Sequence, residues 1–455
     1  MEYKLTVGLE VHAELKTKTK MFCSSKNDPD EERPNVNICP VCLAHPGTLP
    51  TINEEAVKHV LRVGLAVGGK LADFTEWDRK NYFYPDIPKG YQISQYQYPL
   101  VTGGSLAGVA LTRIHLEEDT ARSIHDDKEG GSLIDFNRAG VPLMELVTEP
   151  VITSSKQAGD FARELKLLLR YLDVSEANME KGEMRVEANI SISPTQGGSA
   201  LGRKVEVKNL NSFRSVEQAI EYEVARQTKL LEAGEKVVQE TRGWDENKGV
   251  TFSQRLKESS HDYRYFPDPD LPKLRISEIP QFQNLGATLP ELPWQKRARL
   301  TGLGFLQVQD VEQIVADFEL SKFFDELTAT LKDPSLIKIA ANFLLNDIAG
   351  RRKSNPDWLP SVAHVAEVVR RYGAKEISSP QAKSSILSGV MAEMASAESL
   401  TGLVEKVIEA NPKVVADYKA GKEIALKFLI GQGMKESKGS ANPSVLEDLF
   451  KKALV

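Results

Sequence analysis

The stretch VGLEVHAEL, Val7–Leu15, alternates apolar and polar residues with a period of two. Successive side chains of a β-strand point to opposite faces of a sheet, so the apolar set Val7, Leu9, Val11, Ala13 and Leu15 would share one face. Glu10 and His12 then lie together on the other face, about 7 Å apart along the strand. The stretch therefore predicts a half-buried strand that presents a polar pair.

The same alternation recurs in Thr112–Glu118, Arg185–Ser193 and Lys204–Lys208. Two other segments, Ser155–Leu172 and Ser215–Ala233, carry apolar residues at helical spacing instead. Strands mixed with a few helices and long irregular stretches are typical of an α+β fold. We expect an N-terminal α+β domain with a largely antiparallel sheet.

The chain changes character after a proline-rich stretch between Pro267 and Pro293, and a linker is expected near residues 273–292. Beyond it the periodicity is helical, and GQGMKESKGSANP (Gly431–Pro443) is expected to separate two helices. We expect three domains, over residues 1–292, 293–396 and 397–455. The helices expected before residue 397 are Trp294–Leu303, Val308–Leu331, Pro334–Ile348, Leu359–Tyr372 and Gln381–Ser396.

Composition indicates an ordinary globular protein, with 41% hydrophobic and 27% charged residues among 455. No apolar run approaches the ~20 residues of a membrane span, and the N-terminal residues have no apolar signal core. Three cysteines do not make a disulfide framework, so a reducing, cytoplasmic environment is expected. The net charge of −6 argues against a nonspecific nucleic-acid binder but leaves a local basic patch open.

Nucleotide signatures such as the Walker phosphate loop and the dinucleotide glycine fingerprint are absent from the sequence. Several polar segments could instead form one carboxylate-rich face. Taken singly, a Glu–x–His pair or an acidic run is more often a solvated strand face. Together they would suit Mg²⁺ in phosphoryl transfer, while a histidine ligand leaves Mn²⁺ open. The segments are Glu10 with His12, Glu117–Asp119, Glu145, and Arg185 with Glu187.

Four longer motifs give the chain its family resemblance: VGLEVHAEL, NYFYPDIPKGYQISQ (Asn81–Gln95), LEEDTAR (Leu116–Arg122) and DYRYFPDPDLP (Asp262–Pro272). With them the chain resembles the B subunits of tRNA-dependent aspartyl/glutamyl-tRNA amidotransferases. Further matching stretches, among them DFNRAGVPLMELVTEP and GQGMKESKGSANP, extend the resemblance over essentially the whole chain. Long motifs in a fixed order are far more specific than one short pattern.

The resemblance implies a two-step reaction on a misacylated tRNA. ATP phosphorylates the side-chain carboxylate of Glu or Asp esterified to tRNA(Gln) or tRNA(Asn), and ammonia then displaces the phosphate to give the amide. It also implies a glutaminase A subunit that supplies the ammonia and a small C subunit in a heterotrimer. Residues 1–292 would be catalytic and residues 397–455 would bind tRNA. Which of the two acceptors is used stays open.

The resemblance also implies residue roles. The cation ligands would be His12, Glu118 and Glu145, with Glu10 serving a second cation. We infer that Lys80 and Arg185 contact phosphate, because positive side chains there would offset the charge that develops during transfer.

Glu187 departs from the family pattern, since RVEAN stands here where the family more often has RCDAN, and its part in nucleotide or metal binding is therefore open. Three tyrosines either line the cleft or simply pack in the core: Tyr82, Tyr84 and Tyr91.

The cysteines resemble an incomplete zinc site. Zinc-bearing members of the family have four thiols in two pairs, whereas this chain has Cys23, Cys39 and Cys42, with Ser25 at the fourth position. Serine is a poor zinc ligand, so a closed site would need water or His45. Zinc binding and three inert cysteines both remain open.

Two alternatives differ from the amidotransferase reading in class. A degenerate homologue would bind tRNA or a partner without catalysis, and we would expect it to have lost one or more of the cation ligands. This chain keeps all four: Glu10, His12, Glu118 and Glu145. A ligase using the same metal face on a free amino acid would leave the tail idle and would act without tRNA.

Overall fold

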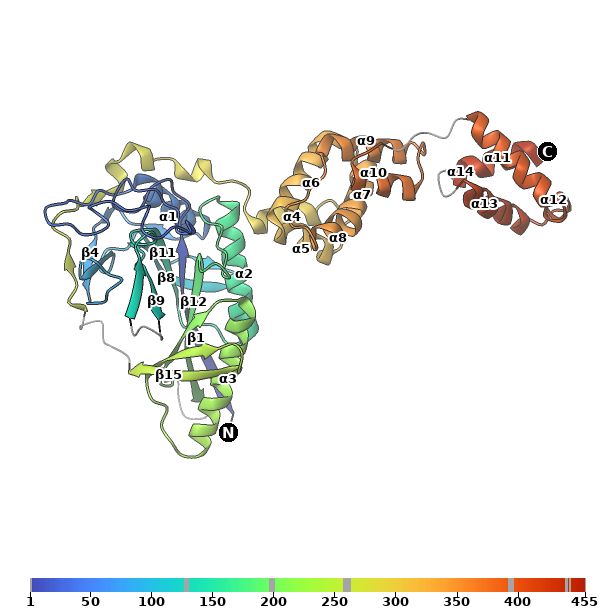
Figure 1. The fold of residues 1–455 in the computed structure, drawn as a ribbon. Coiled ribbons are helices and arrows are strands. Elements are labelled where there is room, and N and C mark those ends of the chain that lie inside the picture. Colours follow the sequence, from blue (N-terminus) through green and yellow to red (C-terminus); the bar gives the residue numbers. More distant parts are fainter. Residues whose placement is uncertain are drawn as a thin grey trace. The chain divides into compact units, whose positions relative to one another are not determined.

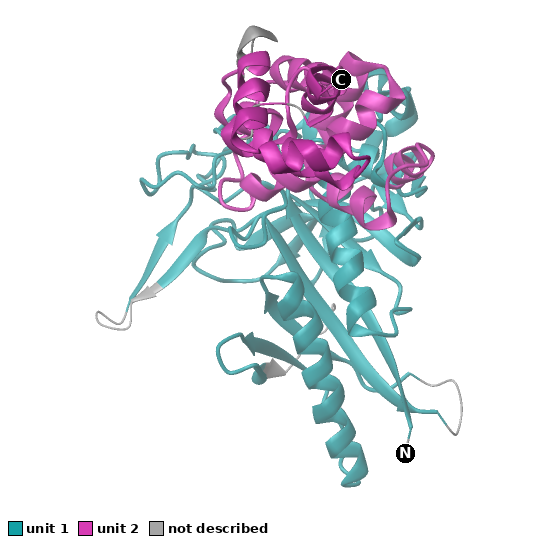
Figure 2. Ribbon diagram, turned by 90° about the vertical axis from the view of Figure 1, so that its right-hand side faces the viewer, with its two compact units in different colours: residues 1–293 teal, residues 294–455 magenta. Residues whose placement is uncertain are grey.

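The computed structural model describes residues 2–126, 131–195, 201–256, 263–391, 397–437, 441 and 443–454. The chain divides into two compact units, Met1–Pro293 and Trp294–Val455 (Figure 2). A mixed sheet fills the first unit and helices make up the second, so the expected α+β class is confirmed. The further division of the helical part into two domains stays a prediction.

The first unit is built on a ten-stranded sheet in its described part, in the order β15-β14-β13-β12-β1-β11-β8-β6-β2, with β7 paired to β8 (Figure 1). Only β13 and β14 pair in parallel within the described part of this sheet, so it is largely antiparallel. The strands are β1 Tyr3–Glu14, β2 Lys70–Leu71, β6 Val101–Thr102, β7 Ser105–Leu106, β8 Val109–Glu118, β11 Pro142–Thr148, β12 Met184–Pro194, β13 Val205–Leu210, β14 Glu240–Asp245 and β15 Val250–Leu256.

Smaller strand groups stand beside this sheet. A three-stranded sheet has the order β16-β4-β5, and two strand pairs, β9 with β10 and β3 with β17, complete the described strands of the unit. Their bounds are β3 Phe74–Thr75, β4 Asp78–Asn81, β5 Tyr91–Ser94, β9 Arg122–Asp126, β10 Gly131–Asp135, β16 Phe266–Pro267 and β17 Leu274–Arg275.

The alternation in Val7–Leu15 sets the core of the first unit. Val7, Leu9, Val11 and Ala13 are buried, while Glu10 and His12 point to the partly open side of β1. Helices α2 (Ser155–Tyr171) and α3 (Phe213–Glu232) lie side by side next to the sheet (Figure 1). The predicted strand thus has the expected buried face.

Helix boundaries follow local capping. Ser154 and Ser212 each accept a hydrogen bond from a backbone N–H of the first turn, which starts α2 and α3. A third helix, α1 (Glu54–Ala66), begins at Asn53 in the same way and packs near β8 and β6.

The segment 273–292, expected as a linker, forms three short 3₁₀-helices, η2 Ile276–Glu278, η3 Pro280–Phe282 and η4 Leu285–Thr288. Ile276, Phe282 and Leu285 are buried, so this segment packs into the first unit. Pro280 stands at the first position of η3, where a proline is tolerated, so the proline-rich composition does not make the segment a free spacer.

The second unit is helical, as predicted, but two helices are shorter than expected. Asp317 caps the start of α6 through Leu320 N, which splits Val308–Leu331 in two. Gly389, in the left-handed region at φ 74°, ends α10, and the expected continuation over 392–396 lies outside the described residues. From Pro293 onward the helices are α4 Pro293–Thr301, α5 Val308–Ala316, α6 Phe318–Leu331, α7 Pro334–Phe343, the π-helical turn η5 Leu344–Ile348, α8 Ala349–Arg352, α9 Val362–Gly373, α10 Ser379–Ser388, α11 Ala397–Ala410, α12 Pro412–Lys419, α13 Ile424–Glu436 and α14 Pro443–Leu454.

The expected break across GQGMKESKGSANP is wrong in its first half. Helix α13 runs through Gly431 and Gly433 to Glu436, and residues 438–440 and 442 lie outside the description. A Cβ on Gly433 would stand 3.1 Å from Leu446 Cδ1 and 3.3 Å from Phe450 Cε2. This glycine therefore serves the close packing of α13 on α14 instead of ending the helix.

Among the described residues, no helix combines the length and the apolar character needed to cross a membrane.

Candidate active site

Strand register assembles a row of polar residues across four strands. Arg185 of β12 lies opposite His12 of β1, which lies opposite Glu145 of β11, which lies opposite His115 of β8. Directly opposed residues of antiparallel strands point to the same face. Four segments far apart in the sequence therefore contribute to one polar surface.

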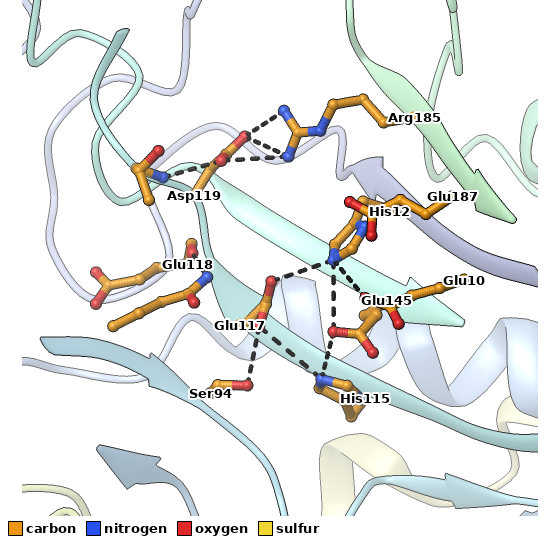
Figure 3. A network of polar contacts seen from close by, with 12 residues as sticks. Glu10, His12, Ser94, His115, Glu117, Glu118, Asp119, Glu145, Arg185 and Glu187 are labelled. Atoms are coloured by element: carbon orange, nitrogen blue, oxygen red, sulfur yellow. Dashed lines mark hydrogen bonds and ion pairs between the residues drawn. The ribbon is translucent and has the colours of Figure 1, made fainter. Parts of the chain in front are cut away.

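A cluster of carboxylates and imidazoles occupies this surface (Figure 3). His12 Nε2 lies 3.4 Å from Glu145 Oε2, 3.7 Å from Glu117 Oε1 and 3.9 Å from Glu10 Oε1. His115 Nε2 lies 3.2 Å from the same Glu145 oxygen. We call these five residues the carboxylate–histidine cluster.

Burial and mutual charge shift the pKa of each group in the cluster. Burial lowers the pKa of His12, but the hydrogen bond and charge of Glu145 outweigh it and raise the pKa to about 10. Burial opposes ionisation of His115 as well, and Glu145 again prevails, raising its pKa to about 9. Burial, followed by repulsion from Glu145, raises the pKa of Glu10 to about 7.

Two carboxylates of the cluster stay ionised. Burial would raise the pKa of Glu145, but His115 and His12 hold it well below its usual range. Burial likewise opposes ionisation of Glu117, and the hydrogen bond of His115 lowers its pKa. Two protonated imidazoles thus balance the acids, and a divalent cation would displace such protons when it binds.

The cluster fits a small divalent cation. Ligand atoms of Glu10, His12 and Glu145 lie within 4.8 Å of one another, as do those of His115, Glu117 and Glu145. Adjacent ligands of Mg²⁺ stand about 3 Å apart, so the carboxylate oxygens, now 3.4, 3.7 and 3.9 Å from His12 Nε2, would have to move slightly inward around an ion. The other ring nitrogen of His12, Nδ1, is buried without a hydrogen-bond partner among the described residues.

Glu118 does not join this cluster. Its Oε1 accepts a hydrogen bond from Ile93 N at 2.9 Å and lies 2.6 Å from Lys89 Nζ. Neighbouring residues of a strand point to opposite faces, so Glu117 faces His12 while Glu118 faces away, as Figure 3 shows. Glu117 was not among the ligands expected from the sequence. Its spacing of two from His115 is the signal that could have identified it.

Lys80 lies on β4, next to the cluster. Its Nζ stands 5.0 Å from the ring of Tyr263 and 5.8 Å from that of Tyr82. Burial opposes its charge, but Glu117 and Glu145 raise its pKa. Lys80 is therefore a cation held beside the acids, where a phosphate contact was expected.

Arg185 and Glu187 do not pair with each other. Nη1 and Nη2 of Arg185 each lie 3.3 Å from a carboxylate oxygen of Asp119, and Glu187 Oε2 lies 2.8 Å from Lys208 Nζ. Glu187 stands opposite Glu10 in the register. Arg185 thus lies close to the cluster and forms an ion pair with Asp119. Glu187 lies beside the cluster and forms an ion pair with Lys208.

The acidic run Glu117–Asp119 is buried, unlike a typical solvated run, with at most 6% of each residue exposed. Each acid has its own cation or donor. Ser94 Oγ donates to Glu117 at 2.9 Å, and Asp119 accepts from Arg185 and Arg138. The run is therefore a set of three buried carboxylates, each with its own hydrogen-bond donor or cation.

The three cysteines converge. Their sulfur atoms lie within 4.8 Å of one another, and Ser25 Oγ lies 3.8 Å from Cys42 Sγ. Contact with Cys23 and the charge of buried Lys20, whose Nζ is 3.9 Å away, help to lower the pKa of Cys42 to about 4. The geometry fits a soft cation with three thiolates, with a hydroxyl where a closed site has its fourth thiolate.

A cavity of about 220 Å³ joins the cysteines to the far side of the acidic run. Its lining includes Cys23, Cys42, His45, Lys89 and Glu118. The side chain of Glu118 thus belongs to the thiol side of the sheet and not to the carboxylate–histidine side.

Comparison with known families identifies the chain. A family model described as "GatB/GatE catalytic domain" matches residues 5–280, and one described as "GatB domain" matches residues 322–454. The chain belongs to the GatB family. The resemblance inferred from the sequence motifs is thereby confirmed.

Curated GatB relatives match over essentially their full length. Proteins named as the B subunit of aspartyl/glutamyl-tRNA(Asn/Gln) amidotransferase are 41% identical in Caldanaerobacter subterraneus subsp. tengcongensis and in Moorella thermoacetica, with 100% of both chains covered. That of Caldicellulosiruptor saccharolyticus is 40% identical over 100% of this chain and 99% of its own. The carboxylate–histidine cluster lies wholly within the residues matched by the GatB/GatE catalytic domain.

Proposed function

We propose that this chain is the B subunit of an aspartyl/glutamyl-tRNA amidotransferase. It would activate the side-chain carboxylate of Glu or Asp esterified to tRNA(Gln) or tRNA(Asn) with ATP and convert it to the amide. The observation that carries the proposal is the carboxylate–histidine cluster, since phosphoryl transfer between two anions needs cations at the point of contact.

Glu10, His12, Glu117 and Glu145 would hold the metal, with Mg²⁺ the first choice and Mn²⁺ compatible with the imidazole ligand. When bound, the metal would neutralise phosphate oxygens of ATP and orient the terminal phosphate for transfer. Glu145 bridges both imidazoles and so keeps the ligand atoms in place. The burial of Glu117 and Glu145 keeps the local dielectric low, which strengthens their pull on a cation.

Lys80 would contact a phosphate oxygen. Its ammonium stands against two tyrosine rings and beside the buried acids Glu117 and Glu145, so a phosphate oxygen brought to the cluster would lie near it. Arg185 would orient Asp119 and the end of β8, and could exchange that carboxylate for a phosphate oxygen.

Ammonia would then attack the acyl phosphate, and phosphate would leave as the amide forms. A glutaminase A subunit and a small C subunit would complete a heterotrimer, because this sequence holds no recognisable glutaminase. The helical tail would bind the tRNA. Three cysteines without a disulfide support a cytoplasmic complex.

The test uses the purified heterotrimer with labelled ATP and misacylated tRNA, without glutamine. The terminal phosphate is expected to be cleaved slowly as water captures the activated carboxylate. An ammonium salt should then restore amidated tRNA without any glutaminase activity. His12→Ala should abolish both the cleavage and the rescue, because the phosphates lose their alignment.

Three results would overturn the proposal. ATP cleavage by the wild type without tRNA would indicate a ligase for a free amino acid. Absence of any ATP cleavage would indicate a binding module. Full rescue by ammonium in His12→Ala would remove the cluster from the chemistry.

A further inference from the structure

Aromatic side chains gather beside Lys80 in a wall that the chemistry above does not use. We call the aromatic wall the five residues Tyr82, Phe83, Tyr84, Tyr263 and Phe266, which with Asn81 and Arg264 line a cavity of about 560 Å³. Phe83 is 84% exposed, Tyr84 51% and Phe266 44%. Single exposed aromatics are common, but several lining one cavity mark a binding surface.

The wall is a built feature of the fold. Asn81 Nδ2 donates to Tyr263 O at 3.1 Å and to Arg264 O at 2.9 Å, which ties together two segments far apart in the sequence. The ring of Tyr82 lies 5.9 Å from those of Tyr84 and Tyr263 in edge-to-face contact. Strand β4 carries Asn81 and pairs with both β5 and β16, so the sheet supports the wall.

Arg264 adopts φ 47°, a left-handed conformation that a residue with a side chain rarely takes. Its side chain is exposed, and its backbone oxygen is held by Asn81. Strained residues of this kind persist where the surrounding structure imposes them, and they gather at functional sites. The described lining of the cavity holds this one cation and no carboxylate, which suits an anionic ligand.

The wall is continuous with the carboxylate–histidine cluster. Lys80 stands against Tyr82 and Tyr263 on one side and feels the charges of Glu117 and Glu145 on the other. Tyr82 OH also donates to Gln92 Oε1, and Gln92 Nε2 donates to Glu118 O at 2.6 Å. A ligand on the wall would therefore extend directly from the reacting group.

We propose that the aromatic wall binds the unpaired 3′ end of the aminoacylated tRNA, with its rings stacked on the terminal bases and Arg264 near a backbone phosphate. The proposal rests on the function proposed above. The reacting carboxylate is tethered by an ester to the terminal ribose, so the terminal base must lie beside the cluster. Five rings along one wall offer more stacking surface than the single adenine of ATP can cover, and unpaired nucleotides are recognised by such stacking.

The experiment compares the wild-type heterotrimer with Phe83→Ala in steady-state amidation. The KM for misacylated tRNA is expected to rise about tenfold or more, with kcat and the KM for ATP within twofold of wild type. Phe83→Trp should restore the KM because it keeps an aromatic face, while Phe83→Leu should not. Phe252→Ala is the matched control, since Phe252 is 44% exposed on β15 of the same unit.

A binding measurement isolates the 3′ end. The same variants are titrated with the tRNA and with that tRNA shortened by its unpaired 3′ nucleotides. Phe83→Ala should weaken binding of the intact tRNA about tenfold and leave binding of the shortened tRNA unchanged. Because Phe83 is 84% exposed, Phe83→Ala should leave the melting temperature of the complex unchanged. Measuring it on the same samples checks that the variant is folded.

Three results would overturn the proposal. An unchanged KM for tRNA in Phe83→Ala would remove the wall from substrate binding. A raised KM for ATP alone would make it an adenine site for ATP. If the Phe83→Ala variant lost its partner subunits during purification, the aromatic wall would be a protein interface. In each case the proposed function would still hold if the wild-type complex amidates tRNA. A wild-type complex without this activity would contradict the proposed function itself.

Discussion

Glu117 and Glu118 are neighbours in the chain with opposite surroundings. Glu117 lies 3.7 Å from His12 Nε2, whereas Glu118 pairs with Lys89 on the other side of β8. The family resemblance implies Glu118 as the cation ligand, and the geometry favours Glu117. At this scale the alternation of a strand decides which of two identical side chains faces His12.

Glu117→Gln removes a carboxylate from the cluster while keeping its shape. We expect ATP-dependent amidation to fall at least about 100-fold and the Mg²⁺ concentration for half-maximal rate to rise. Glu118→Gln is the matched variant. It should lose less activity than Glu117→Gln and keep the wild-type Mg²⁺ dependence, because the contacts that change, with Lys89 Nζ and Ile93 N, lie on the other side of β8. The opposite ranking would assign the ligand role to Glu118.

Ser25 occupies the fourth position of the cysteine group. Ser25→Cys would add a thiol where the hydroxyl oxygen now stands 3.8 Å from Cys42 Sγ. We expect zinc affinity to rise at least about tenfold, because four thiolates close the tetrahedral shell. Competition with a chromogenic chelator measures this without any activity assay. Ser25→Ala serves as the control, and equal affinity in Ser25→Cys would mean that the fourth position is not at residue 25.

At the scale of elements, the site depends on register and close packing. Each residue of the polar row sits opposite the next only in the observed pairing of β12, β1, β11 and β8. A slip of one residue would move Glu10 and His12 to the core face. The helices that cover the core must therefore pack tightly enough to hold that pairing.

Gly64 lets α1 approach the sheet edge. A Cβ at this position would lie 2.5 Å from Val101 Cγ2 and 3.0 Å from Leu71 Cδ2. Gly64→Ala should lower the free energy of unfolding of the first unit by about 1–3 kcal/mol through overpacking. Gly286→Ala is the control, because nothing lies within 4 Å of its added Cβ. Urea denaturation of both variants checks the difference, and equal stability would contradict it.

At the scale of the whole molecule, the chain consists of two units, and the last four helices have a core of their own. Leu429, Leu446 and Phe450 are fully buried in that core. The carboxylate–histidine cluster and the tail lie in different units, so we expect a change in the tail core to leave the cluster unaltered.

Phe450→Ala removes the largest side chain of the tail core and should cost about 3–5 kcal/mol, enough to loosen the tail. We expect the KM for misacylated tRNA to rise with little change in the KM for ATP, as on deletion of residues 397–455. Phe428→Ala is the matched control, since Phe428 is 47% exposed on α13. If neither Phe450→Ala nor the deletion alters the response to tRNA, the tail has no part in binding it.

Features that depend on local patterns could be predicted from the amino-acid sequence. The alternation in Val7–Leu15 identified β1 and its buried face, and the helical spacing of Phe161 and Leu165 identified α2. These patterns suffice because each residue's face follows from its nearest neighbours in the chain. The long motifs likewise carried the family, because many residues in a fixed order leave few alternatives.

Which side chains meet could not be predicted from the sequence and became clear from the folded chain. Glu117 joins His12 and Glu145 while Glu118 turns to Lys89, and Arg185 pairs with Asp119 rather than with Glu187. Gly433 continues a helix where a break was expected, since Phe450 packs against it. Each outcome depends on strand order, register or packing between segments distant in the chain, and no local pattern contains those distances.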